Sequence, residues 1–102
     1  MQPIITENRE KIAELCRQHH VRRLSVFGSA ARDDFDPQRS DVDLLVDFDK
    51  LNELQYAPNW SSFLQALVSY FGREVDLLTE TQVKNPYLRR SIEADKVTLY
   101  AG

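Results

Sequence analysis

Cysteine and excess basic charge are scarce in this sequence of 102 residues. Its single cysteine, Cys16, excludes an internal disulfide, and no second cysteine offers the spacing of a zinc site, so we expect Cys16 to pack as a small apolar residue. With a formal net charge of −3, the chain lacks the excess of basic residues that counterion release on nucleic acid requires. We therefore expect no direct nucleic-acid partner.

Long apolar runs are missing as well. The sequence has no charged-then-apolar leader and no run of about 18 apolar residues, so it supports neither secretion nor a membrane span. We expect a soluble cytoplasmic protein. With 42% hydrophobic and 10% aromatic residues, a chain of this length can bury one compact core, and we expect residues 1–102 to form a single domain.

The hydrophobic pattern predicts helices and strands in turn along the chain. Helices are expected from a cap at Thr6 to about His19, from a cap at Ser29, from a cap at Asn59 to Gly72, and from Asn85-Pro86, with a capping box over residues 79–82. Strands are expected over residues 21–27, 41–48, 74–78 and 97–100, the last at a sheet edge. Residues 33–39 and 49–58 are expected to be loops.

The strand over residues 41–48 alternates strictly between apolar and acidic positions. One face would carry four apolar side chains, Val42, Leu44, Val46 and Phe48, and the other would carry Asp41, Asp43, Leu45 and Asp47. A register slip of one residue would bury the carboxylates, so the apolar face fixes the register. The acids are therefore expected on a common face away from the core.

This acidic face suits divalent cations. Side chains two residues apart on a strand, such as Asp41 and Asp43, point the same way with roots roughly 6 to 7 Å apart, a span that can bracket two ions about 3.5 to 4 Å apart. Asp76 is the best third ligand, because it is an isolated acid on an apolar strand, where an unpaired charge is costly. Carboxylates favour Mg²⁺ or Mn²⁺, and Mg²⁺ is shared with substrate phosphates, so a nucleotide is the natural ligand.

A Gly-Ser pair lies at the end of the strand before this face. Gly28 lets the backbone approach phosphate oxygens, while Ser29 offers a hydroxyl and the N–H groups of a helix start. Arg32 could steady phosphate charge or be a surface cation that pairs with Asp33 or Asp34. Each feature alone is weak: Gly-Ser is a common turn, and Asp-x-Asp occurs on many exposed strands. An arginine could simply partner Asp76.

Together, in this order, these features resemble a known family. The segments 28–32, 40–46 and 75–78, which read Gly-Ser-Ala-Ala-Arg, Ser-Asp-Val-Asp-Leu-Leu-Val and Val-Asp-Leu-Leu, are similar to the three motifs of minimal nucleotidyltransferases of the polymerase-beta superfamily. Residues 85–92 and Leu99-Tyr100 also resemble that group, so the similarity covers nearly the whole chain. The loop between Ser29 and Asp41 is one residue longer than the commonest spacing, which a loop tolerates cheaply.

The resemblance implies an α/β (α+β) nucleotidyltransferase fold, a small mixed sheet with helices mainly on one face. It implies two Mg²⁺ ions and ATP as substrate. Asp41, Asp43 and Asp76 would be the catalytic metal ligands. The chemistry of the residues themselves makes Gly28, Ser29 and Arg32 the expected nucleotide-binding residues. Asp47 lies further along the strand, and we expect it to be a solubilising residue.

The same resemblance extends to the antitoxins of toxin–antitoxin pairs whose other member is a HEPN-domain ribonuclease. It implies transfer of AMP from ATP to a tyrosine of the toxin, within a hetero-oligomer of the two proteins. Two alternatives are kept. One is an antitoxin that neutralises by binding alone, and the other is nucleotidyl transfer to a small hydroxylated molecule.

Overall fold

The computed structural model describes residues 2–32, 36 and 41–102. The predicted polar loop over 33–39, apart from residue 36, and Ser40 of the second motif lie outside the described residues. The elements are, in chain order, α1 (Pro3–Thr6), α2 (Arg9–Gln18), β1 (Val21–Phe27), the 3₁₀ turn η1 (Gly28–Ala30), β2 (Val42–Phe48), α3 (Glu53–Phe71), β3 (Val75–Thr79), the 3₁₀ turn η2 (Glu80–Gln82), α4 (Pro86–Asp95) and β4 (Val97–Ala101).

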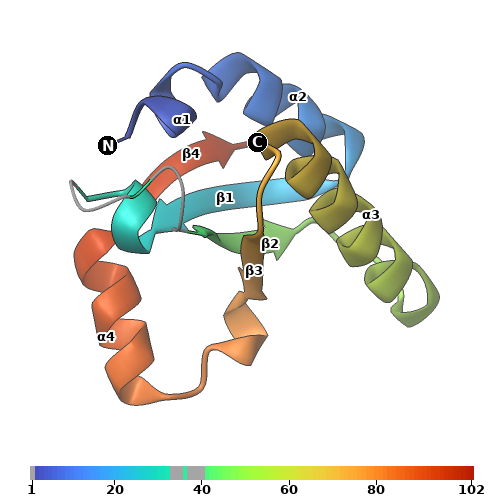
Figure 1. Ribbon diagram of the computed structural model, residues 1–102. Coiled ribbons are helices and arrows are strands. Elements are labelled where there is room, and N and C mark those ends of the chain that lie inside the picture. The colour runs from blue at the N-terminus through green and yellow to red at the C-terminus, as the bar shows by residue number, and fades with distance from the viewer. Residues whose placement is uncertain (1, 33–35, 37–40) are drawn as a thin grey trace.

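The four strands form one mixed sheet in the order β3-β2-β1-β4 (Figure 1). Strand β1 is antiparallel to both β2 and β4, whereas β2 and β3 run parallel. The last strand lies at an edge, as the sequence predicts. This arrangement confirms the expected mixed sheet, and it places β2, the strand of the acidic face, between β1 and β3.

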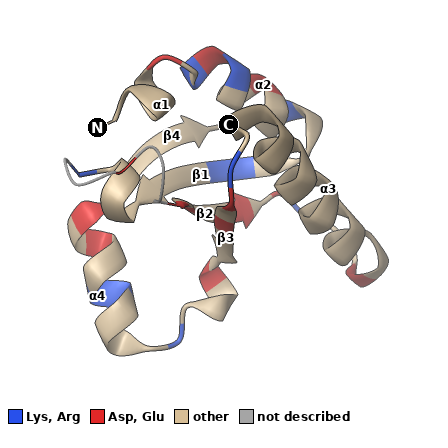
Figure 2. Cartoon of the chain, in the orientation of Figure 1, with Lys and Arg blue, Asp and Glu red and all other residues tan. Residues whose placement is uncertain are grey.

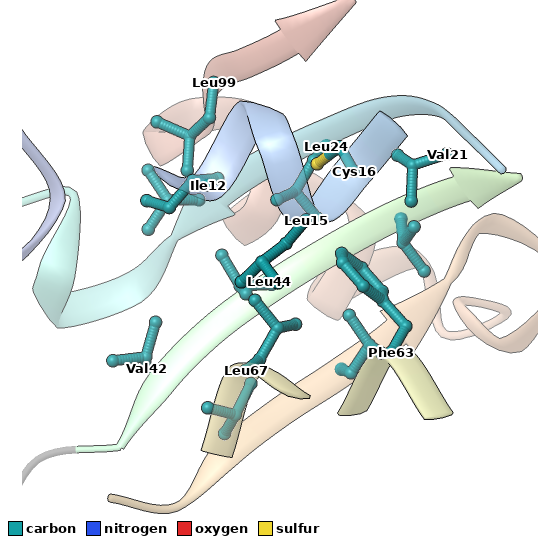
Figure 3. Packing of buried hydrophobic residues seen from close by; sticks show 14 of the residues in the cluster. Ile12, Leu15, Cys16, Val21, Leu24, Val42, Leu44, Phe63, Leu67 and Leu99 are labelled. Atoms are coloured by element: carbon teal, nitrogen blue, oxygen red, sulfur yellow. The ribbon is translucent and has the colours of Figure 1, made fainter. Parts of the chain in front are cut away.

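One face of the sheet carries the main core (Figure 3). The alternate apolar positions of β2 that the sequence assigns to the core are all buried there, against α1, α2 and α3. Phe63 and Leu67 of α3 and Ile12 of α2 are at most 1% exposed. Each such side chain contributes roughly 1.5–3 kcal/mol of burial free energy. Cys16 also packs in this core, and its burial raises the pKa of the thiol to about 12.

The opposite face is not bare, which corrects the expectation that the acids share a face without a core. A second apolar cluster lies there, built from Phe27, Leu45, Val83 and Ile92 with Leu78 against it. Ile92 belongs to α4, so α4 covers part of this face while the other three helices cover the main core. The helices are therefore mainly on one face, as expected, but α4 covers part of the acidic face.

The predicted first helix begins at Arg9, later than the expected cap at Thr6 allows. A short helix, α1, precedes α2, and Asn8 rather than Thr6 occupies the N-cap position of α2. The Asn8 side chain instead donates to the carbonyl oxygen of Ile4 at 2.8 Å, a local bond that competes with continuous helix. The break between α1 and α2 lets Ile5 of α1, which is fully buried, reach the main core.

The longest helix starts earlier than predicted. The sequence predicts a loop through Pro58 and a cap at Asn59, but α3 begins at Glu53, with Asn52 and Gln55 forming a capping box. Pro58 lies inside the helix and cannot donate to the carbonyl of Leu54. Leu54 is 89% exposed, so water can satisfy that carbonyl.

The other predicted helix boundaries are confirmed. Gly72 ends α3 in the left-handed conformation with φ +66°, Thr79 and Gln82 form the capping box of η2, and Asn85 caps α4 through the backbone N–H groups of Tyr87 and Leu88. His19 lies at the end of α2, where its ring nitrogen bonds the carbonyl of Leu15. Within the described part of the chain, no helix is both long and apolar enough to cross a membrane.

Candidate active site

The Gly-Ser pair forms a tight turn directly after β1. Gly28 opens η1 with φ +68°, and its carbonyl accepts from the N–H groups of Ala31 at 3.1 Å and Arg32 at 3.2 Å. The prediction that Ser29 caps a helix is wrong, because the turn begins one residue earlier and Ser29 lies inside it. The left-handed backbone at Gly28 is the reason, since only glycine adopts it at little cost and so starts the turn.

Gly28 also touches the acidic face. A Cβ built on Gly28 would lie 3.3 Å from Cγ of Asp43 and would overlap its Oδ2. Phe27 and Asp43 are register partners in the antiparallel pair of β1 and β2, which brings the residue after Phe27 close to Asp43. The glycine turn and the acidic strand therefore form one site.

Two of the three predicted metal ligands lie side by side. Asp43 of β2 and Asp76 of β3 are register partners in the parallel pair, and paired residues point to the same face. Asp41 is exposed, one residue before β2, where Val42 donates its N–H to the carbonyl of Glu74 at 3.2 Å. Figure 2 shows acidic segments where β2 begins and on the neighbouring β3. The predicted convergence of the acids on one face is confirmed for Asp43 and Asp76.

The acids repel one another electrostatically. The pKa of Asp43 is raised from its ordinary 3.8 to about 6, first by burial and then by the charges of Asp76 and Asp41, while the charge of Arg32 lowers it. Among the described residues, no lysine or arginine forms an ion pair with Asp76, so the alternative that an arginine partners it is not borne out there. The site carries negative charge that a cation would stabilise.

The donor chemistry fits Mg²⁺. The paired carboxylates of Asp43 and Asp76 offer hard oxygen ligands, and Mg²⁺ typically takes only one or two protein carboxylates together with waters and substrate phosphates. No three His, Cys, Asp or Glu side chains in the described residues are grouped closely enough to form a complete metal cage. The arrangement therefore suits a cation shared with a bound triphosphate better than a closed structural metal site.

Arg32 and Asp47, the two charged residues not yet placed, lie in different parts of the structure. Arg32 is exposed and forms an ion pair with Asp95 at the end of α4, whereas Asp33 and Asp34, its predicted alternative partners, lie outside the described residues. Asp47 accepts from Nη2 of Arg22 at 2.7 Å and from its Nε at 3.2 Å. Asp47 is thus engaged at the other end of β2, which agrees with leaving it out of the site.

Sequence reasoning missed Asp95. It is 63 residues from Arg32 in the chain and belongs to a helix with no recognisable motif at that position. The signal that could have found it is weak, since an acid in the last turn of a helix is unfavourable to the helix dipole and so invites a search for a partner cation.

Comparisons with known proteins show the family of the chain. The family model described as nucleotidyltransferase domain matches residues 9–99. A Methanocaldococcus jannaschii protein, provisionally named a protein adenylyltransferase, is 34% identical over 99 residues, which covers 85% of this chain and 93% of the relative. The protein adenylyltransferase MntA of Thermococcus cleftensis is 32% identical over 85 residues, covering 83% of this chain and 79% of MntA.

Two solved structures are also similar. A protein provisionally described as a minimal nucleotidyltransferase superposes with a TM-score of 0.73 at 30% identity and covers 95% of both chains. A complex of the tri-AMPylated Shewanella oneidensis HEPN toxin with an MNT antitoxin gives a TM-score of 0.63 at 21% identity, covering 95% of this chain and 72% of the matched chain, and shows the fold alone. The chain belongs to the nucleotidyltransferase domain family, and the enzyme class that its three motifs predict is confirmed.

Proposed function

We propose that this nucleotidyltransferase moves AMP from ATP onto a tyrosine hydroxyl of a HEPN-domain ribonuclease toxin, and so neutralises the toxin as its antitoxin. The observation that carries the proposal is the register of β2 and β3, which pairs Asp43 with Asp76 on the face that Gly28 contacts. Relatives named protein adenylyltransferase support AMP as the transferred group and a protein as acceptor. The AMPylated HEPN toxin in a structurally similar complex supports the kind of partner.

The reaction is a displacement at phosphorus. The tyrosine oxygen attacks the α-phosphorus of ATP, a new oxygen–phosphorus bond forms, and the bond from that phosphorus to the oxygen bridging to the β-phosphate breaks. Pyrophosphate leaves with that oxygen. The hydroxyl proton passes to Asp76, which is exposed and therefore open to an incoming acceptor. The protein forms no covalent intermediate, so its contribution is positioning and charge stabilisation.

Each predicted site residue has a role in this proposal. Gly28 and Ser29 seat the triphosphate on the backbone N–H groups of the turn, and Gly28 leaves the Asp43 carboxylate its space. Asp41, Asp43 and Asp76 would hold two Mg²⁺ ions. When bound, Mg²⁺ neutralises phosphate charge and favours deprotonation of the attacking hydroxyl.

The proposal treats residues 1–102 as one catalytic domain that works in the cytoplasm, where ATP is abundant, within a complex of antitoxin and toxin. The direct test incubates the purified protein with ATP labelled in the α-phosphate, Mg²⁺ and a candidate HEPN-domain partner protein. Label on a tyrosine of that protein, with release of pyrophosphate, is the expected result. Removal of Mg²⁺ with a chelator should abolish labelling, and added Mg²⁺ should restore it.

The two alternatives give other outcomes in the same experiment. Label on a small hydroxylated molecule would replace the protein acceptor. A tight complex that inhibits the ribonuclease with no label anywhere would identify a non-catalytic antitoxin and would contradict the proposed transfer.

A further inference from the structure

Arg32 is held by two segments that are distant in sequence. Its guanidinium Nη1 forms an ion pair with Asp95 at the end of α4, and its backbone carbonyl accepts from Nε2 of Gln2 at 2.6 Å. Gln2 also donates its backbone N–H to the carbonyl of Ala30 at 3.1 Å. The turn that carries Gly28 is therefore fixed from both sides.

Asp95 is the more enclosed partner of the ion pair. Its side chain is 19% exposed, against 46% for Arg32, so the acid is largely enclosed and the cation faces outward. Ile92, one turn earlier in α4, is buried in the second apolar cluster and anchors this end of the helix. Figure 2 shows an acidic segment at the end of α4 nearest to η1.

Arg32 also lies on the turn that contacts the candidate active site. Its backbone N–H donates to the carbonyl of Gly28 at 3.2 Å, and Gly28 lies against the Asp43 carboxylate. The guanidinium's fork of donors is planar and rigid, so an ion pair through one nitrogen orients the whole group. A triphosphate that binds at this acidic face needs a cation to offset the repulsion. If the Arg32 side chain is already ordered, less conformational entropy is lost when the nucleotide binds.

We propose that Asp95 is a positioning residue that holds the Arg32 guanidinium at the edge of the acidic face, ready for the triphosphate of the nucleotide. This inference rests on the proposed function for the identity of the ligand. Asp95, the last residue of α4, thereby has a role in nucleotide binding although it lies outside the three sequence motifs.

The test compares Asp95→Asn with a matched control on the same turn. Glu93 pairs with Lys96 at 2.9 Å and takes no part in the Arg32 contact, so Glu93→Gln should leave ATP binding unchanged. Asp95→Asn should weaken ATP binding, measured by calorimetry with Mg²⁺ present, by about fivefold to tenfold. It should raise KM for ATP by a similar factor and change kcat little, which a general loss of structure would not do.

A double variant separates positioning from a direct contact. Because Asp95 acts through Arg32, the variant Asp95→Asn with Arg32→Ala should bind ATP no more weakly than Arg32→Ala alone. Additive losses, or wild-type ATP affinity in Asp95→Asn, would overturn the inference while leaving the proposed function intact. If the wild-type protein neither binds ATP nor transfers AMP, the proposed function is overturned, and the inference with it.

Discussion

Gly28 lies against the carboxylate of Asp43, and a side chain on the glycine would occupy the space of that carboxylate's Oδ2. Gly28 directly follows β1, and Asp43 lies on the antiparallel partner strand β2. The position of the Asp43 carboxylate requires a residue without a side chain at position 28. The glycine permits the left-handed turn after β1, and the turn in turn leaves room for the acid. The first and second motifs of the sequence are therefore one structural unit.

Replacement of Gly28 by alanine should stop nucleotide transfer. The variant would adopt φ +68° at a cost of roughly 1–2 kcal/mol and would also displace the Asp43 carboxylate. Gly72→Ala is the matched control, because Gly72 has φ +66° but no neighbouring atom lies within 4 Å of the position that an alanine Cβ would take. Both variants should lose similar stability in urea unfolding, yet only Gly28→Ala should lose transfer. Equal activity in the two variants would contradict the contact.

The free energy of unfolding should respond to pH through Asp43. Its folded pKa of about 6 exceeds the ordinary 3.8, so the folded state holds this proton longer than the unfolded state. The stabilisation that this proton provides is fully present below about pH 4 and is lost as the pH rises through about 6.

Asp43→Asn should therefore be more stable than the wild type at pH 7 without divalent cations, by roughly 1–2 kcal/mol after allowance for solvent screening. Below pH 4 the difference should vanish. Urea unfolding at several pH values measures it, and added Mg²⁺ should stabilise the wild type more than the variant. A constant difference across this pH range would show that Asp43 does not titrate as stated.

Pro58 should weaken α3. Its ring removes the hydrogen bond to the Leu54 carbonyl, so Pro58→Ala should stabilise the protein by roughly 1–3 kcal/mol. Pro86→Ala is the control, because Pro86 lies in the first turn of α4, where no such bond is lost, and its replacement should change stability by less than about 1 kcal/mol. Thermal unfolding measures the stability of both variants. A destabilised Pro58→Ala would contradict this expectation and show that packing of the Pro58 ring stabilises the protein.

Local rules predict the strands well and the helix starts poorly. The bounds of β1 and the shared face of Asp43 and Asp76 follow from alternation, because a slip would bury charge. The same rules predict helix caps at Thr6, Ser29 and Asn59, and none of the three is a cap. Backbone geometry and tertiary packing decide which residues cap. Thr6 ends the separate helix α1, whose Ile5 is buried, and the Asn52 capping box starts α3 before Pro58.

Long-range contacts could not be predicted from one sequence. The second apolar cluster joins Leu45 to Ile92, and the ion pair joins Arg32 to Asp95, across stretches of chain with no shared pattern. A surface ion pair contributes about 0–1 kcal/mol and leaves no periodic signal in the sequence. Only the fold brings α4 over the acidic face.

The central claim, that Asp43 and Asp76 form the catalytic pair, is tested most directly by AMP transfer from labelled ATP with Mg²⁺ in three variants. Asp47 is the matched control, since it lies on the same strand but pairs with Arg22 at the other end. We predict that Asp43→Asn and Asp76→Asn remain folded and lose transfer by about 100-fold or more, while Asp47→Asn retains it. Wild-type rates in Asp43→Asn, or equal losses in all three variants, would contradict the claim.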